Sequence, residues 1–444
     1  MIEKPKRSRR PGRTPGSRRA ARAVALGLLR GVLHGGRTLD LLFETDEGLR
    51  ELDGRDRGLA RMMALTCLRR LGALDLMIAQ CLDRPPPPKA RAAMDLTRLG
   101  LTQILYMDIP DHAAVDETVS LAQSIGAGPY KSMINAILRR ATRERDSLLD
   151  LAAQPGACLP PWLFRRWRKT FGLQRAGAIA AALPKPAPLD ISVKGDLQTW
   201  SRRLDARILP TGSLRLKATG NVTDLEGFAD GAWWVQDAAA AIPPRLFGDP
   251  RGRTVIDLCA APGGKTASLA AQGAKVVAVD RSESRMKRLR ENMDRLGLDV
   301  ESDIVDGGDF VRGEKVDGVL VDAPCSATGT LRRHPDAAWL KKPRDIERLV
   351  RTQTRLIARG ASLLKPGGLL IYCVCSLEPE EGAERVRAAL ADSSLGLARH
   401  PVASGDLPGI ESFLTNEGHI MTLPSFWPEI GGLDGFFAAR FVKS

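Results

Sequence analysis

Residues 254–266 read TVIDLCAAPGGKT, and this stretch decides the fold of the C-terminal half of the chain. It begins with a short apolar, β-prone run, passes through a glycine-containing turn and enters a helical pattern over residues 266–271. A strand, a tight turn and a helix in this order aim backbone N–H groups and the positive end of the helix at a ligand. The next β-branched run, AKVVAVD, ends in Asp280, and an acid at the end of the second strand of a βαβ unit is placed to bind ribose hydroxyls. We therefore expect a nucleoside-like ligand.

Three ligands compete for this loop. A P-loop requires a glycine five residues before the GK of GGKT, where this chain has Cys259. A dinucleotide site requires G-x-G-x-x-G, which CAAPGG lacks. S-adenosylmethionine (SAM) is the remaining candidate ligand for the loop. In the alternative interpretation the segment is an ordinary strand-to-helix turn, in which Gly263 and Gly264 serve only to allow positive φ.

Composition indicates a globular protein with a polyanionic partner. The chain has 444 residues, enough for about two to four domains. A net charge of +14 favours nucleic acid as the partner, although a solvated basic surface would give the same charge. Seven scattered cysteines without a signal peptide indicate reduced thiols in the cytoplasm. No apolar run approaches the roughly 20 residues that span a bilayer, so no membrane association is expected.

The N-terminal part is predicted to be a basic tail followed by a helical domain. Residues 1–19 are expected to form a disordered basic tail that adds sequence-independent affinity for phosphate, although an Arg-rich, acid-poor start also fits a transit peptide. Residues 20–145 carry apolar positions three and four apart, which is typical of amphipathic helices. Breaks at Gly35-Gly36, at the four prolines of 85–88 and at Pro110 separate these helices.

Residues 146–235 are predicted to form a small α+β domain that binds RNA or links the larger domains. Its segment LPPWLFRRWRKTFG, residues 159–172, interleaves four aromatic residues with four basic ones. Such a segment can stack on bases and pair with phosphates. It can equally be a helix whose aromatic face belongs to the core, and the residues alone leave both interpretations open.

Residues 236–444 alternate strand and helix patterns, which predicts a parallel, doubly wound sheet. The predicted strands are 254–258, 275–279, 302–305, 316–321 and 368–374, and the predicted helices are 266–271, 282–296, 345–364 and 379–391. After about residue 395, shorter β-like runs end in GGLDGFFAARFV, which suggests an antiparallel hairpin closing the edge of the sheet.

Two cysteines follow strands of this sheet. Strand 316–321 continues into Asp322 and Cys325, and strand 368–374 is followed directly by Cys375. Ligands of open α/β sheets sit beyond the carboxyl ends of the strands, so both thiols are expected beside the SAM loop. A redox or metal pair is the alternative, but no third or fourth ligand has zinc spacing, and we predict no metal.

Methylation at C5 of a pyrimidine is the chemistry that needs a thiolate near SAM. C5 becomes nucleophilic only after a thiolate adds to C6, and loss of the C5 proton later lets the thiol leave. A free thiol with a pKa of about 8.5 ionises little at neutral pH, so its site should be electropositive. Lys265 and the pair Arg332-Arg333 are the candidate cations. Asp322 is placed to bind N3 or the exocyclic amine of cytosine.

Several motifs resemble those of known RNA methyltransferases. DLCAAPGGKT, DAPCSATGTLRRHPDAAW, LKPGGLLIYCVCSLEPEE and GLDGFFAAR resemble successive motifs of the RNA 5-methylcytosine methyltransferases of the Nol/Nop/Sun (Fmu) family. RDRGLARMMALTCLRR, DIPDHAAVDETVSLA and INAILRR are similar to the NusB-like domain fused to its bacterial RsmB members. The resemblance implies three domains: an all-α NusB-like domain (20–145), the small α+β domain (146–235) and a Rossmann-like class I SAM-dependent methyltransferase (236–444).

The resemblance also implies the residues that bind the cofactor. The SAM loop would be Cys259, Ala260, Ala261, Pro262, Gly263, Gly264 and Lys265. Asp280 would bind the ribose, with Arg285 nearby. Asp306 would lie near the adenine, with Asp303 as the weaker candidate, and Asp322 would lie between cofactor and base.

By the same resemblance the catalytic residues are Cys375, Cys325, Asp322 and Lys265. Cys375 would be the nucleophile and Cys325 would assist product release, whereas DNA cytosine methyltransferases use the cysteine of the Pro-Cys motif. The chain departs from the family at Cys373-Val374, where a small polar residue and a threonine are usual, and at Gly382, where asparagine is common. Cys373 shares a strand face with Cys375 and is a candidate substitute or regulatory thiol.

The expected function is SAM-dependent C5 methylation of a cytosine in 16S ribosomal RNA of the small subunit. A transfer RNA substrate is the alternative of the same class. A non-catalytic RNA-binding or ribosome-assembly factor is the alternative of another class, and the intact Cys325 and Cys375 argue against it. Neither a metal nor an oligomer is implied.

Overall fold

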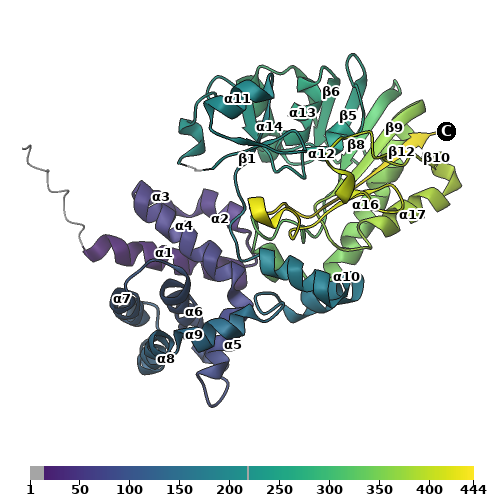
Figure 1. Cartoon of the computed structure of the whole chain (residues 1–444). Coiled ribbons are helices and arrows are strands. Elements are labelled where there is room, and N and C mark those ends of the chain that lie inside the picture. Colours follow the sequence, from purple (N-terminus) through teal and green to yellow (C-terminus); the bar gives the residue numbers. More distant parts are fainter. Residues whose placement is uncertain (1–14, 218–219) are drawn as a thin grey trace, which may run out of the picture. The chain divides into compact units, whose positions relative to one another are not determined.

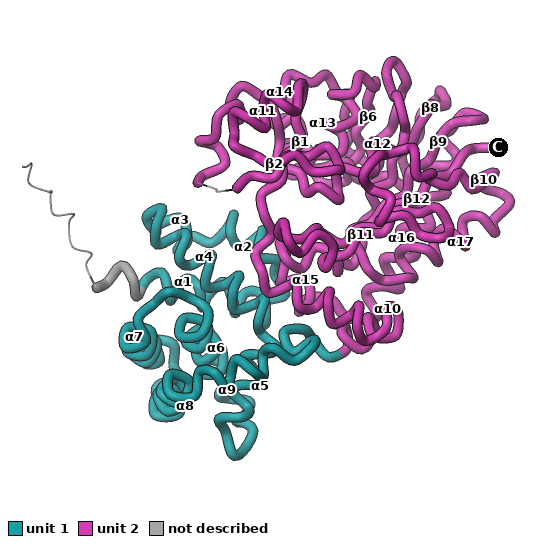
Figure 2. Tube along the Cα trace, viewed as in Figure 1, with its two compact units in different colours: residues 1–161 teal, residues 162–444 magenta. Residues whose placement is uncertain are grey.

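The computed structural model describes residues 15–217 and 220–444. The chain divides into two compact units, Met1–Pro161 and Trp162–Ser444 (Figure 2). The predicted basic tail lies outside the described residues as far as residue 14. Helix α1 (Pro15–Leu33) begins inside the predicted tail, with proline at its first position, where the missing N–H costs no hydrogen bond.

The described residues of the first unit are all-α, as predicted. The α-helices are α1, α2 (Leu39–Thr45), α3 (Glu47–Glu51), α4 (Gly54–Arg69), α5 (Leu71–Gln80), α6 (Arg91–Tyr106), α7 (Asp111–Ser124), α8 (Lys131–Arg143) and α9 (Arg145–Ala153). Helix α6 is central and packs against α1, α4, α5, α7 and α8. Its fully buried Asp95 is held by Arg98 Nη1 at 2.8 Å and lies 2.8 Å from His34 Nε2. The breaks fall at the predicted glycine and proline positions.

The second unit contains a mixed sheet (Figure 1). Its strands are β5 (Thr254–Leu258), β6 (Lys275–Asp280), β7 (Val300–Ile304), β8 (Val316–Asp322), β9 (Leu364–Val374), β10 (Leu397–Arg399), β11 (Ile420–Thr422) and β12 (Phe436–Lys443). Their spatial order is β10-β12-β9-β8-β5-β6-β7, with β11 paired to β12. Strands β5 to β9 pair in parallel, whereas β12 is antiparallel to β9. The sheet is therefore the predicted doubly wound one with an antiparallel edge.

Helices cover both faces of this sheet. Helices α16 (Pro343–Leu363) and α17 (Ala383–Ala391) contribute to one buried cluster, together with Val319 and Val321 of β8. Helices α12 (Ile242–Arg245) and α13 (Gly264–Ala271) contribute to the other, together with Leu320. Neighbouring residues of β8 thus face opposite layers, which explains the continuous apolar run VDGVLV. Helix α14 (Glu283–Leu296) packs against β6 and β7.

A second, smaller sheet precedes this one in the chain. Its strands are β1 (Asp190–Val193), β2 (Arg207–Ile208), β3 (Leu214–Arg215) and β4 (Trp233–Val235), in the order β2-β3-β1-β4 and antiparallel throughout. Helix α11 (Leu197–Arg203) packs against β2. Helix α10 (Pro161–Ala182) precedes this sheet in the chain and contacts Glu378 through Arg166 and Trp167. Ile191, Leu214 and Trp233 form the core beside the sheet.

One predicted helix starts too early. The prediction placed it at 379–391, but α17 begins at Ala383. Residues 376–382 form a loop with a turn, in which Glu381 N–H donates to Glu378 O at 3.1 Å. The acids of this loop resemble those of a helix start, but Glu378 and Glu381 are 2% and 0% exposed because both bind groups elsewhere in the fold. Among the described residues no helix is long and apolar enough to cross a membrane.

Candidate active site

The predicted SAM loop joins β5 to α13. Cys259 and Gly263 have φ of +66° and +102°, and Gly263 caps the start of α13. A Cβ at Gly263 would lie 3.0 Å from Leu289 Cγ and 3.2 Å from Met293 Cε of α14, so a side chain there would push against α14. Glycine at this position therefore allows the turn and its close packing at once.

Asp280 and Arg285 tie this loop to the second strand. Asp280 ends β6 and is 3% exposed; its carboxylate accepts hydrogen bonds from Ala261 N at 3.2 Å and Ser282 N at 2.9 Å. Arg285 of α14 donates to Ala261 O and lies 3.5 Å from Asp280 Oδ2. The two residues thus support the loop backbone from the side of β6.

Asp306 follows β7 and has a cation partner that the sequence analysis missed. Arg355 of α16 donates to its Oδ1 at 2.6 Å, and Gly308 N donates at 2.9 Å. Burial raises the pKa of Asp306, but the two hydrogen bonds together with the charges of Arg355 and Arg281 lower it by more, so the carboxyl is ionised at neutral pH. Arg355 is far from Asp306 in the sequence, and no local pattern predicted the contact between them. Asp303, the weaker candidate, is exposed on β7.

Asp257 is a second residue that the sequence analysis missed. It lies within β5, is 0% exposed, and accepts a 2.7 Å hydrogen bond from Thr266 Oγ1. Its other oxygen, Oδ1, is buried with no hydrogen-bond partner among the described residues. Burial raises the pKa of Asp257 to about 7. An acid inside the apolar run TVIDL was the signal that could have found it.

The loop and these carboxylates fit SAM. Asp280 binds the loop backbone at Ala261 N and Asp322 binds Lys265. Burial raises the pKa of Cys259, and the charges of Asp280, Asp322, Asp257 and Asp306 raise it further. SAM carries an ammonium and a sulfonium group together with ribose hydroxyls, and carboxylates suit all three. The unpartnered Oδ1 of Asp257 is a further acceptor for a donor group.

Lys265 and Asp322 connect the SAM loop to the end of β8. Lys265 Nζ lies 2.6 Å from Asp322 Oδ2, and the lysine side chain is 11% exposed. Burial lowers the pKa of Lys265, but Asp322 and the thiols of Cys373 and Cys375 raise it by more, so the amine stays charged. Cys373 Sγ lies 3.6 Å from the other oxygen of Asp322. Asp322 and Cys373 are register partners on β8 and β9, so the sheet holds these two side chains together. Lys265 reaches Asp322 from α13.

The two predicted catalytic thiols meet at this rim. Cys325 Sγ and Cys375 Sγ are 3.4 Å apart, and both are free thiols. The hydrogen bond with Cys375 raises the pKa of Cys325 well above its ordinary value, and burial raises it further. Burial, followed by the charge of Asp322, also raises the pKa of Cys373. Cys325 and Cys373 are therefore neutral thiols at physiological pH.

Comparison with known proteins identifies the family. Residues 248–442 match the family described as 16S rRNA methyltransferase RsmB/F, and residues 19–143 match the NusB family. A ribosomal RNA small subunit methyltransferase B from Klebsiella pneumoniae subsp. pneumoniae is 35% identical, with 88% of this chain and 91% of the relative covered. A relative of the same name from Serratia proteamaculans is 35% identical over 96% of this chain and 98% of its own length. The chain belongs to the RsmB/F family.

The fold is shared over nearly the whole chain with a solved structure. The crystal structure of PH0851 superposes with a TM-score of 0.73 at 23% identity, and covers 96% of this chain and 99% of its own. The class I methyltransferase fold with a NusB-like N-terminal domain is therefore established for this RsmB/F family member.

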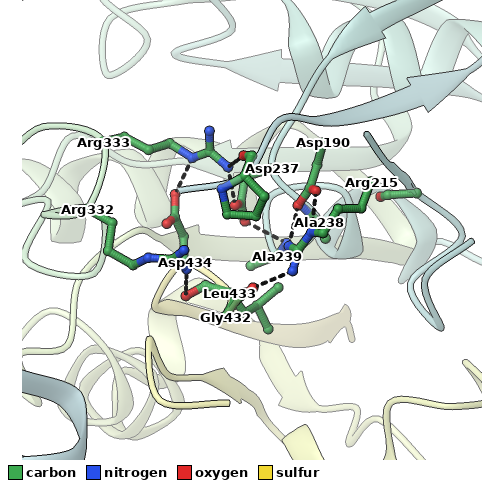
Figure 3. A network of polar contacts seen from close by, with 12 residues as sticks. Asp190, Arg215, Asp237, Ala238, Ala239, Arg332, Arg333, Gly432, Leu433 and Asp434 are labelled. Carbon is green, nitrogen blue, oxygen red and sulfur yellow. Dashed lines mark hydrogen bonds and ion pairs between the residues drawn. The ribbon is translucent and has the colours of Figure 1, made fainter. Parts of the chain in front are cut away.

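Arg332 and Arg333 do not supply the positive charge predicted for the thiols. Arg333 lies between two carboxylates, 2.8 Å from Asp237 Oδ2 and 2.8 Å from Asp434 Oδ2 (Figure 3). Arg332 is 1% exposed and donates to backbone carbonyls, among them that of Leu433 at 3.3 Å. Both arginines bind the 431–434 segment because it carries the carboxylate and carbonyl groups that match them. Lys265 remains as the cation beside the thiols.

Part of the aromatic and basic segment belongs to the core, and part of it is exposed. Trp167 of α10 is fully buried and donates to Glu378 Oε1 at 3.1 Å, so it belongs to the core. Arg166 pairs with Glu378 at 2.7 Å and with Glu380 at 2.6 Å. The remaining basic residues of α10 are exposed, namely Arg165, Arg168, Lys169 and Arg175.

Proposed function

We propose that this chain transfers a methyl group from SAM to C5 of a cytosine in 16S ribosomal RNA. The observation that carries the proposal is the thiol pair: Cys325 Sγ and Cys375 Sγ are 3.4 Å apart, beside the Lys265–Asp322 ion pair. The names of the RsmB relatives support the substrate class. SAM, held by residues 259–265 with Asp280, Arg285, Asp306 and Asp322, supplies the methyl group.

The nucleophile is Cys375. Its thiolate adds to C6, and the electron pair of the C5–C6 double bond becomes available at C5, which takes up the methyl group as the bond between that methyl and the sulfur of SAM breaks. Loss of the C5 proton to water re-forms the double bond as the C6–S bond breaks, so the thiolate is regenerated. Cys325 stays a neutral thiol next to Cys375 and assists this release.

Lys265 and Asp322 prepare both reactants. The ammonium of Lys265 is the cation on the side of the thiols, and a cation there stabilises the negative charge of an attacking sulfur. Asp322 accepts from Lys265 with one oxygen. We assign its carboxylate to bind N3 or the exocyclic amine of the cytosine.

The rest of the chain holds the RNA. The base must be unpaired or flipped out, since C6 is not accessible in a stacked helix. We assign the basic tail of residues 1–19, the NusB-like domain of 20–145 and the small domain of 146–235 to RNA binding, and residues 236–444 to catalysis. The reaction takes place in the cytoplasm, where the ribosomal subunit is made.

Methyl transfer to RNA tests the proposal directly. The full chain is incubated with methyl-labelled SAM and 16S ribosomal RNA from cells that lack it, with transfer RNA from the same cells in parallel. Bisulfite sequencing then locates the modified base. Label at one cytosine of the 16S RNA supports the proposal. Label confined to transfer RNA would establish the other substrate, and SAM binding without label in any RNA would establish a non-catalytic factor.

A further inference from the structure

A single buried carboxylate joins the two loops that carry the thiols. Glu381 is 0% exposed and accepts hydrogen bonds from Ser326 N at 2.9 Å, from Ser376 Oγ at 2.5 Å and from Gln353 Nε2 at 3.0 Å, as well as from Ser326 Oγ. Ser326 follows Cys325, and Ser376 follows Cys375. Each thiol is therefore one residue away from a serine bound to the same carboxylate.

Backbone hydrogen bonds run beside this carboxylate. Gly329 N donates to Cys375 O at 3.0 Å, and Leu377 N donates to Thr328 Oγ1 at 3.0 Å. These bonds also cross from one loop to the other, but they are neutral, whereas Glu381 is the charged group that binds the residue after each thiol. A charged acceptor makes stronger hydrogen bonds than a neutral one, and a buried one is costly to leave unpaired.

The loop that carries Glu381 is fixed from its other side as well. Glu378 is 2% exposed and accepts from Trp167 Nε1 at 3.1 Å and from Arg166 Nε at 2.7 Å, both of α10. Because residues 376–381 are held at both ends of the turn, the carboxylate of Glu381 has a defined place relative to Cys375.

We propose that Glu381 is the positioning residue of the thiol pair, which holds the Cys325 loop against the Cys375 loop so that both sulfurs face one bound base. The inference rests on the proposed function and adds to it a residue that makes no contact with the reacting atoms. Glu381 acts through Ser326 and Ser376.

The charge of Glu381 also acts on the Cys325 thiol. The hydrogen bond with Cys375 raises the pKa of Cys325 most, followed by burial and the charge of Cys375, and the charge of Glu381 raises it further. Cys325 therefore keeps its proton at physiological pH. The carboxylate of Glu381 reaches this loop at Ser326 N, one residue after Cys325.

The test compares three variants of the full chain. Glu381→Gln removes the charge and keeps the size, Glu381→Asp keeps the charge and shortens the reach, and Glu384→Gln removes an exposed carboxylate three residues away on α17 as the matched control. Circular dichroism and the melting temperature establish that each variant folds.

The first measurement needs neither RNA nor SAM. Alkylation of each cysteine by iodoacetamide is followed by peptide mass spectrometry as a function of pH. In Glu381→Gln the pKa of Cys325 obtained from this profile should fall, whereas Glu381→Asp and Glu384→Gln should change it little. An unchanged Cys325 profile in a folded Glu381→Gln protein would overturn the charge effect.

The second measurement is methyl transfer to 16S RNA. We expect kcat to fall about 100-fold in Glu381→Gln and in Glu381→Asp, with KM for SAM and RNA nearly unchanged, since a misplacement of about 1 Å has this effect. A loss confined to KM, or none, would overturn the positioning role. If the unsubstituted chain methylates no RNA while the alkylation profiles still differ, the proposed function fails and the effect of Glu381 on the thiols stands.

Discussion

Cys325 Sγ and Cys375 Sγ lie 3.4 Å apart although 50 residues separate them in the chain. The parallel pairing of β8 with β9 brings them together, because Asp322 is the register partner of Cys373 and both cysteines follow within three residues. In the proposed reaction both thiols act on the same base, Cys375 as the nucleophile and Cys325 in product release.

Replacement of each thiol should therefore give a different defect. Cys375→Ser should abolish methyl transfer and form no covalent complex, because no thiolate can add to C6. Cys325→Ser should accumulate a covalent RNA–protein complex, since addition proceeds while release is impaired. Gel electrophoresis under denaturing conditions distinguishes the two, with Cys81→Ser in the helical unit as the control. The opposite pattern would exchange the assigned roles.

Lys265→Met should lower methyl transfer at least about 100-fold, or about 2.7 kcal/mol in activation free energy. The variant removes the cation beside the thiols and leaves Asp322 with the weak S–H donor of Cys373. Lys365→Met is a matched control, because Lys365 pairs with Asp317 at the opposite end of β8, at 2.9 Å and 51% exposed. The rate of the control variant should stay within about twofold. Equal rates for both variants would show that Lys265 has no role in the reaction.

The strands around the site could be predicted because each one is a short apolar run with a ligand-binding turn after it. Runs such as TVIDL and VDGVLV are buried on both faces, and the ends of β6, β8 and β9 fix where Asp280, Asp322 and Cys375 lie. The positive φ of Gly263 could also be expected, because a glycine stands in the turn that precedes α13.

What could not be predicted depends on contacts between distant residues. In the sequence Glu381 has the pattern of an acid in the first turn of a helix, but in the structure it binds Ser326, 55 residues away. Arg333 was predicted to supply positive charge to the thiols, but Asp237 and Asp434 bind it. Local patterns contain no information on such partners, because only the assembled sheet brings these groups together.

Asp257 should make the stability of the second unit depend on pH. Its pKa is raised to about 7 by burial, against an ordinary value of 3.8. The folded state therefore holds a proton that the unfolded state releases, so this stabilisation is complete below about pH 3.8 and is lost as pH rises through about 7.

Asp257→Asn cannot lose such a proton. The difference in melting temperature, variant minus unsubstituted chain, should rise between about pH 5 and about pH 8. Asp317→Asn is the control, because hydrogen bonds with Lys365 and Thr254 lower the pKa of Asp317 and its titration lies below this range. A flat difference for Asp257→Asn would show that this carboxyl does not titrate near neutrality.

Arg333→Met should destabilise the second unit by about 3–5 kcal/mol, since it leaves Asp237 and Asp434 buried without their shared cation. Arg348→Met removes an arginine that is 70% exposed and 3.7 Å from Asp345, and should cost no more than about 1 kcal/mol. Urea unfolding followed by tryptophan fluorescence measures both values. A loss below about 1 kcal/mol for Arg333→Met would mean that the two carboxyls are protonated when the arginine is absent.

The exposed basic residues of α10 should bind RNA without a role in folding. Arg165, Arg168 and Lys169 are exposed, whereas their neighbours Arg166 and Trp167 bind Glu378. Replacing the three exposed residues by alanine should leave the melting temperature unchanged and weaken RNA binding. Each lost phosphate contact lowers the slope of log Kd against log salt by about 0.7 for single-stranded RNA, so a decrease of about 2 is expected. Replacing Arg251, Arg253 and Lys275 by alanine is the charge-matched control, because these three exposed residues lie where β5 and β6 begin, at the opposite end of the sheet from the 259–265 loop. An unchanged slope in the α10 variant would assign this helix to the protein core alone.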